Sequence, residues 1–164
     1  MTLTSLRCLV LACGNALRSD DGVGPWLAEW AEKRFRGDGK VRVVIRQQWT
    51  PELAEAIAGA DSVLFVDCAV DLPPGSIQLI PVASQKEPTV HGASHQFDAA
   101  GLLTLARELY HAKPAHTLLL KIGAGSTELG ETFSGSLNQA LPKACTLLEE
   151  TVLCWLYEGV AQSD

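Results

Sequence analysis

The sequence predicts a single α/β domain with a twisted, mostly parallel five-stranded sheet and helices on both faces. Residues 6–13 and 62–67 are almost entirely apolar, as is typical of parallel strands that are covered on both faces. Strand-like and helix-like segments alternate in a β-α-β-α-β order, which favours right-handed crossovers and parallel pairing. The chain has 164 residues, which suits one domain. We expect that domain to span 1–158 and 159–164 to form a frayed tail.

Each expected element follows from local residue patterns. The apolar and β-branched runs predict strands over 6–13, 41–45, 62–67, 76–82 and 116–122, with 76–82 at a sheet edge because prolines bound it. Apolar residues at helical spacing predict helices over 23–36, 50–58 and 98–109 and a long terminal helix from 134. Thr50, Asp98 and Ser134 are the expected N-caps, and Pro142 lies inside the last helix. Residues 83–96 lack periodicity, so we expect a long loop there.

Composition excludes several classes of protein. The net charge of -6 has the wrong sign for a nucleic-acid binder that releases counterions. No apolar run approaches the ~20 residues that cross a bilayer, and the first residues lack the order of a secretory signal, so we expect a cytoplasmic protein without membrane contact. Five cysteines without a Cys-x-x-Cys motif indicate neither a disulfide framework nor a zinc ribbon.

Three groups of polar residues are expected at the carboxyl edge of the sheet. Asp20 and Asp21 follow the first strand in a glycine-rich loop, Asp67 ends the third strand, and His95 lies in the long loop. Open α/β sheets bind their ligands at this edge. Two carboxylates and one imidazole form a facial set of ligands suited to nickel, zinc or iron, with positions left open for substrate.

Each of these residues also has a purely structural interpretation. Asp67 is costly at the end of a buried strand unless it is paired, metal-bound or hydrogen-bonded to a neighbouring turn. Of Asp20 and Asp21, one can cap the next helix while the other binds, and we favour Asp21 as the ligand. Asn15 orients a ligand or only bends the chain in a left-handed turn.

Other kinds of site find less support in the sequence. His91 and His95 have a metal-like spacing, but the segment is not helical and His-Glu-x-x-His is missing, so an ordinary zinc peptidase is not expected. No Gly-x-Ser-x-Gly motif supports a serine nucleophile. A dinucleotide motif around Gly14 fails because Ala12 and Leu17 occupy its flanking glycine positions, and two acids would repel a pyrophosphate.

The motifs together resemble the nickel-iron hydrogenase maturation endopeptidases. The resemblance rests on Gly14-Asn15-x-Leu17-x-x-Asp20-Asp21-Gly22-x-Gly24, on Phe65-Val66-Asp67 and Ser94-His95-Gln96, and on the glycine-rich turn before the last helix. It implies an aspartyl-type, metal-directed endopeptidase that removes the C-terminal extension of the hydrogenase large-subunit precursor after nickel insertion. The nickel would be carried by the substrate, and its ligands from this chain would be Asp21, Asp67 and His95.

The resemblance is incomplete at one place, and two other functions stay open. Many relatives carry an acid and glycines after the second strand, where this chain has Gln47-Gln48-Trp49 before Thr50. The segment Gln48-Trp49-Thr50-Pro51-Glu52-Leu53 and the helix after His95 look closer to the branch that serves soluble, NAD-linked bidirectional hydrogenases. A nucleotide- or phosphate-binding domain would also fit the fold, because a fold does not fix a function. A non-catalytic, nickel-dependent chaperone of the large subunit would keep the same ligands.

Overall fold

The expected α/β sheet is present in the computed structural model, which describes residues 6–85, 90–91 and 96–161. Its five strands lie in the order β2-β1-β3-β7-β4. β2, β1, β3 and β7 are parallel, and β4 joins antiparallel to β7 at one edge, as its prolines predicted. The strand bounds are β1 Cys8–Cys13, β2 Val41–Arg46, β3 Ser62–Ala69, β4 Ile77–Pro81 and β7 His116–Gly123.

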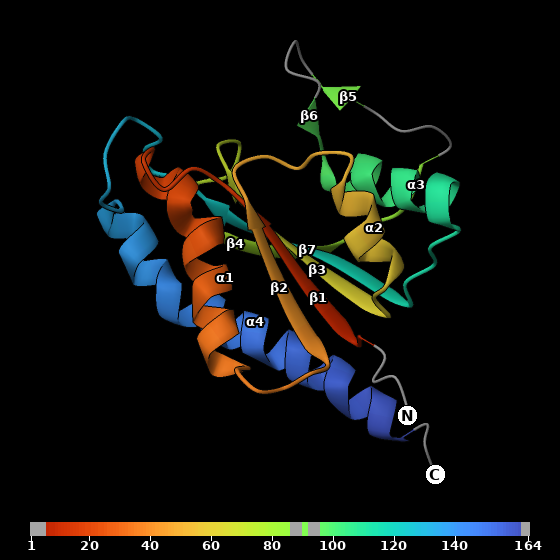
Figure 1. The fold of residues 1–164 in the computed structure, drawn as a ribbon. Helices are drawn as coiled ribbons and strands as arrows, with labels where there is room; N and C mark the ends of the chain where they lie inside the picture. The colour runs from red at the N-terminus through yellow and green to blue at the C-terminus, as the bar shows by residue number, and fades with distance from the viewer. Residues whose placement is uncertain (1–5, 86–89, 92–95, 162–164) are drawn as a thin grey trace.

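Helices cover both faces of the twisted sheet (Figure 1). On one face α1 (Val23–Arg34) and α4 (Gly135–Ala161) pack against apolar side chains of the central strands. On the other face, α2 (Leu53–Ala58) and α3 (Ala99–Tyr110) enclose a second core. The side chains of β1 alternate between the two cores, which is why its sequence is apolar throughout.

Two of the predicted helix caps are confirmed. Asp98 accepts a hydrogen bond from the backbone N–H of Gly101 at 2.6 Å and begins α3. The hydroxyl of Ser134 accepts one from Leu137 N at the start of α4. Pro142 lies inside α4, as expected.

The structure differs from the expectation in three local details. Thr50 is not an N-cap: residues 51–52 form a turn and α2 begins at Leu53 without a side-chain cap. The expected long loop contains a short antiparallel pair, β5 (Val90–His91) with β6 (Gln96–Phe97). The helix α4 continues to Ala161, past the point where the tail was expected to begin, and 162–164 lie outside the described residues.

Candidate active site at the carboxyl edge of the sheet

Two glycines allow the loop after β1 to carry its acids close to the sheet. Gly14 has a φ of +151°, and a Cβ there would lie 2.0 Å from the carbonyl oxygen of Asp21. A Cβ on Gly24 would lie 2.3 Å from the carbonyl oxygen of Cys13 and 3.3 Å from that of Val66. The start of α1 therefore packs directly onto the ends of β1 and β3, which any larger side chain would prevent.

Asp20 is fully buried and anchors the loop. Its Oδ2 accepts hydrogen bonds from Gly125 N at 2.6 Å, Ser126 N at 3.2 Å and the Ser134 hydroxyl at 2.7 Å, and its Oδ1 accepts one from Ser134 N at 2.8 Å. Burial alone raises the pKa of Asp20, but these hydrogen bonds outweigh it and hold the pKa below its ordinary value. Asp20 is thus an ionised structural group that joins three distant segments.

Asp21 is left largely free by the same arrangement. The backbone N–H of Asn15 donates to its Oδ2 at 2.8 Å. The side-chain oxygen of Asn15 accepts from Leu17 N, so Asn15 shapes the turn with its side chain and orients Asp21 with its backbone. In this loop the non-glycine residue with a positive φ is Ser19, so Asn15 does not adopt a left-handed conformation.

Asp67 lies at the end of β3, beside Lys121 of β7 in the strand register. Its Oδ1 accepts hydrogen bonds from Cys68 N at 2.8 Å and from the Cys13 thiol at 3.4 Å. Burial raises the pKa of Asp67 to about 6; the hydrogen bonds and Lys121 oppose the rise, and the charge of Asp21 adds to it. Asp67 is therefore within reach of the charge of Asp21, and the binding of one ion by both acids stays a prediction.

Two cysteines belong to this acidic cluster, and the sequence did not reveal them. Burial raises the pKa of the Cys13 thiol, and the adjacent Asp67 and the charge of Asp21 raise it further. Burial and the charges of Asp21 and Asp67 raise the pKa of Cys68 to about 12. Both thiols stay protonated at neutral pH, so Cys13 acts as a hydrogen-bond donor to Asp67.

A cavity of about 390 Å³ opens beside Asp67. Trp49 lines it, is 4% exposed and packs edge-on against Phe65 with 5.4 Å between ring centroids. Within the described part of the chain, the indole N–H of Trp49 has no hydrogen-bond partner. The remaining lining residues are Cys13, Phe97, Asp98, Ala99, Leu119 and Lys121.

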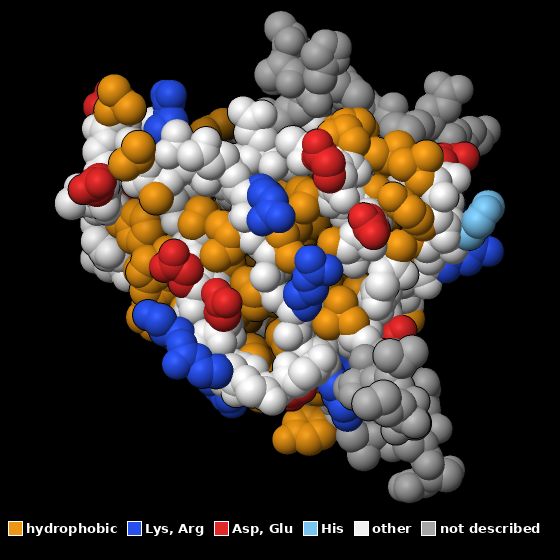
Figure 2. All heavy atoms as spheres, viewed as in Figure 1, with side chains coloured by type: hydrophobic (Ala, Val, Ile, Leu, Met, Phe, Trp, Pro, Cys, Tyr) orange, Lys and Arg blue, Asp and Glu red, His pale blue; other side chains and the backbone are white. Residues whose placement is uncertain are grey.

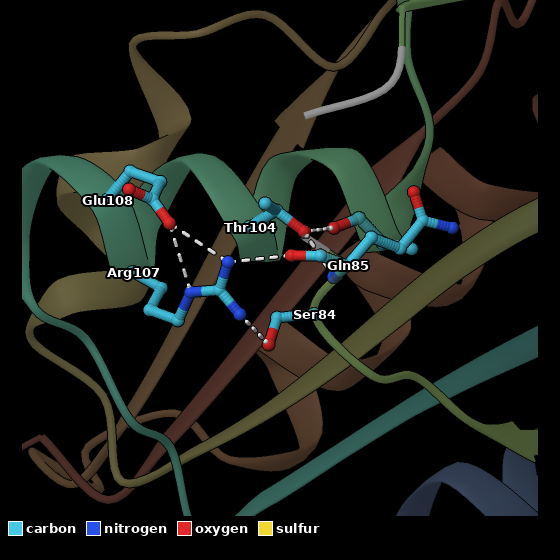
Figure 3. A network of polar contacts seen from close by, with 6 residues as sticks. Ser84, Gln85, Thr104, Arg107 and Glu108 are labelled. Atoms are coloured by element: carbon cyan, nitrogen blue, oxygen red, sulfur yellow. Dashed lines mark hydrogen bonds and ion pairs between the residues drawn. The ribbon is translucent and has the colours of Figure 1, made fainter. Parts of the chain in front are cut away.

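The long loop is fastened to α3 where it begins. Arg107 donates to the Ser84 hydroxyl at 2.8 Å and to the Gln85 carbonyl at 2.6 Å, and the Thr104 hydroxyl accepts from Gln85 N at 2.7 Å (Figure 3). Glu108 pairs with the same guanidinium. These contacts fix the chain up to residue 85, next to the segment that leads to His95.

The third predicted ligand, His95, lies outside the described residues, so its place in the site stays a prediction. Among the residues that are described, no three His, Cys, Asp or Glu side chains are grouped as a metal would require. His116, expected at a strand end, begins β7, where it stacks on Trp155 and pairs with Glu158. No helix in the described part of the chain is long and apolar enough to cross a bilayer.

Comparisons with known proteins agree with the motifs and the geometry. No family model matches the chain. The hydrogenase expression/formation protein HupM of Azotobacter chroococcum mcd 1 is 32% identical over an alignment of 145 residues, and the match covers 85% of this chain. The chain spans 66% of the length of that relative.

Solved structures share the fold. The hydrogenase maturating endopeptidase HybD from E. coli superposes with a TM-score of 0.74 at 24% identity, covering 93% of both chains. The NiFe hydrogenase maturation protease HycI from Thermococcus kodakarensis KOD1 gives 0.65 at 23% identity, covering 88% of this chain and 91% of that one. The resemblance that the motifs indicated is thus confirmed: the chain has the fold of the nickel-iron hydrogenase maturation endopeptidases and resembles a hydrogenase expression/formation protein in sequence.

Proposed function

We propose that this protein is an endopeptidase that removes the C-terminal extension of a nickel-iron hydrogenase large-subunit precursor, and that it recognises nickel carried by the precursor. The observation that supports this most directly is the place of Asp67 near the carboxyl end of β3, within reach of the charge of Asp21. The resemblance to HupM and to the maturation endopeptidases agrees with it. The expected cytoplasmic location stays a prediction.

The two carboxylates are arranged to offer one oxygen each to a substrate. Asn15 N holds Oδ2 of Asp21, whereas Cys13 and Cys68 hold Oδ1 of Asp67. In the part of the chain that the structure describes, the other oxygen of each acid has no hydrogen-bond donor. Burial is the main cause of the raised pKa of Asp67, and a divalent ion between the acids would offset both that burial and the smaller repulsion from Asp21.

The chemistry divides between the precursor and this chain. Nickel on the precursor would either act as a Lewis acid on the scissile carbonyl and on water or serve only to dock the substrate. Asp21 and Asp67, with His95 as the third proposed ligand, position that ion against the scissile bond. Asp20 has no part in binding, because all of its hydrogen bonds serve the loop.

The decisive experiment compares nickel-loaded with nickel-free precursor. We expect the purified protein to shorten only the loaded form, measured by the mass of the large subunit. Asp21→Asn and His95→Ala should abolish the shortening, while Glu29→Gln, which changes an exposed carboxylate on α1, should not. If the wild-type protein leaves the loaded precursor uncut, the endopeptidase proposal is wrong.

The same samples separate the two alternatives. A nickel-dependent chaperone would bind the loaded precursor and leave its mass unchanged. The melting temperature of a nucleotide-binding domain would rise when nucleotide is added and would not change when the precursor is added.

A further inference from the structure

We propose that the open edge of β2 is the docking surface for the precursor's C-terminal extension, which adds to the sheet as an extended strand antiparallel to β2. This inference rests on the proposed function, because it names the substrate segment that the same site would cut. Extended peptides commonly bind to exposed sheet edges in this way. The argument depends on the backbone of β2, on the hollows that flank it and on where it ends.

The backbone of β2 presents groups on its open side that no strand pairs with, and Val41 N and Ile45 O among them are bonded locally to Asp38 O and to the Arg46 guanidinium. Among the described strands, β2 pairs only with β1. Cys8 N donates to Lys40 O, and Gly14 N donates to Arg46 O. The backbone N–H and C=O groups of the even-numbered residues of β2 therefore face β1. By the alternation of a parallel ladder, the N–H groups of Val43 and Ile45 therefore face outwards. The guanidinium of Arg46 donates to Ile45 O at 2.8 Å, which confirms that this carbonyl points to the open side.

The surface on both sides of this edge is hollowed. The edge lies between α1 and α2 and faces the viewer in Figure 1. On the α2 side, Val44 and Leu53 line a hollow of about 600 Å³. On the α1 side, Phe35 and Val41 line one of about 370 Å³. An added strand would place alternate side chains in the two hollows.

The edge carries both signs of charge, and two of its arginines suit a free C-terminus. Arg42 lines both hollows and Arg36 lines the one on the α1 side, where Glu32 and Asp38 also lie, while Glu52 and Glu55 line the other. In the described part of the chain, neither guanidinium forms an ion pair. Figure 2 shows Lys and Arg side chains and Asp and Glu side chains interspersed over this face, with apolar side chains between them. Two unpaired cations near the amino end of β2 suit an α-carboxylate.

The position of the candidate site sets the direction of the added strand. The carboxyl end of β2 is bonded through Arg46 O to Gly14, where the loop that carries Asp21 begins. The scissile bond would lie at the carboxyl edge of the sheet, and the extension that follows it would run from there towards the amino end of β2. The extension would therefore be antiparallel to β2, with its C-terminus near Arg36 and Arg42. Three strand spacings of about 4.8 Å separate the added strand from β3, so about four extended residues would join the scissile bond to the paired segment.

The test uses a synthetic peptide with the sequence of the extension released from the precursor of the same organism and a free α-carboxylate. We expect the peptide to slow hydrogen exchange at the amides of Val43 and Ile45. Val43→Pro removes one outward N–H without touching the ladder to β1, and Val43→Ala is its control for lost packing. We expect Val43→Pro to weaken binding roughly three- to tenfold relative to Val43→Ala, as one lost hydrogen bond predicts. Amidation of the peptide's C-terminus should also weaken binding.

The outcomes separate this inference from the proposed function. Equal affinity of Val43→Pro and Val43→Ala, or unprotected β2 amides in the presence of bound peptide, would overturn the docking surface even where the precursor is cut normally. If Val43→Pro does not fold, the test uses two peptides instead, one N-methylated at odd-numbered and the other at even-numbered backbone nitrogens. Only the peptide whose methyl groups face β2 should lose binding. If the peptide slows hydrogen exchange at the β2 amides but the loaded precursor is not cleaved, the proposed endopeptidase function is refuted instead. Protection that depends on protein concentration and needs no peptide would show that a second copy of this chain covers the edge.

Discussion

Replacing Asp67 with Asn is expected to abolish processing and yet make the protein more stable at neutral pH. The asparagine oxygen keeps the hydrogen bonds from Cys13 and Cys68 but removes the buried charge that lies beside Asp21. The pKa of Asp67 rises from 3.8 to about 6 in the folded protein. At 1.36 kcal/mol per pKa unit, this shift costs the folded state about 3 kcal/mol when the carboxylate is ionised. The expected gain in melting temperature is therefore about 5–10 °C.

The sign of the pH dependence provides the sharper assay. Between pH 3.8 and about 6 the folded protein binds more protons at Asp67 than the unfolded chain, so this group's contribution to stability falls as pH rises and is constant above that window. Urea unfolding of the wild type and of Asp67→Asn should therefore give similar free energies near pH 4 and diverge up to pH 7. A variant that is less stable than the wild type at pH 7, or a difference that does not change with pH, would refute this reasoning. Normal processing by the variant would show that Asp67 serves only the fold.

Two further substitutions test how the acidic loop is built. Asp20→Asn places an amide against donors from Gly125, Ser126 and Ser134, and we expect it to lower the free energy of unfolding by about 2–4 kcal/mol in thermal denaturation. Asp21→Asn should change that free energy by less than about 1 kcal/mol; similar losses for both variants would contradict the division of roles between the two acids. Gly24→Ala forces a methyl group to 2.3 Å from Cys13 O, which should cost about 1–3 kcal/mol and slow processing; unchanged melting would show that α1 moves aside freely.

The sequence predicted the sheet and its helices, because apolar strands and amphipathic helices follow from local patterns, whereas the shared site of Asp21 and Asp67 stays a prediction. From the sequence, either Asp20 or Asp21 could be the structural residue and the other the ligand. The contacts that identify Asp20 as structural lie more than 100 residues away, at Gly125 and Ser134. Cys13 was read as an ordinary core residue because its hydrogen bond to Asp67 depends on the pairing of β1 with β3. The pair β5–β6 has two residues in each strand, too few for a periodic signal.

The burial of Trp49 was also not predicted. It follows β2 in a segment where the sequence predicted neither strand nor helix, and it is buried against the ring of Phe65 in β3, on the far side of β1. The N-cap expected at Thr50 was wrong for a related reason, since the chain completes a turn there before α2 begins. Tertiary contacts outweigh local preferences in this segment.

The hydrogen bonds of Asp20 have a consequence for the order in which the protein is made. The loop that carries Asp21 lies in the first 24 residues, but the donors that hold it in place come from Gly125, Ser126 and Ser134. During synthesis, the amino-terminal strands and helices leave the ribosome long before these donors exist. The acidic loop therefore stays unanchored on the nascent chain, and the protein acquires a formed site only when the beginning of its last helix has emerged.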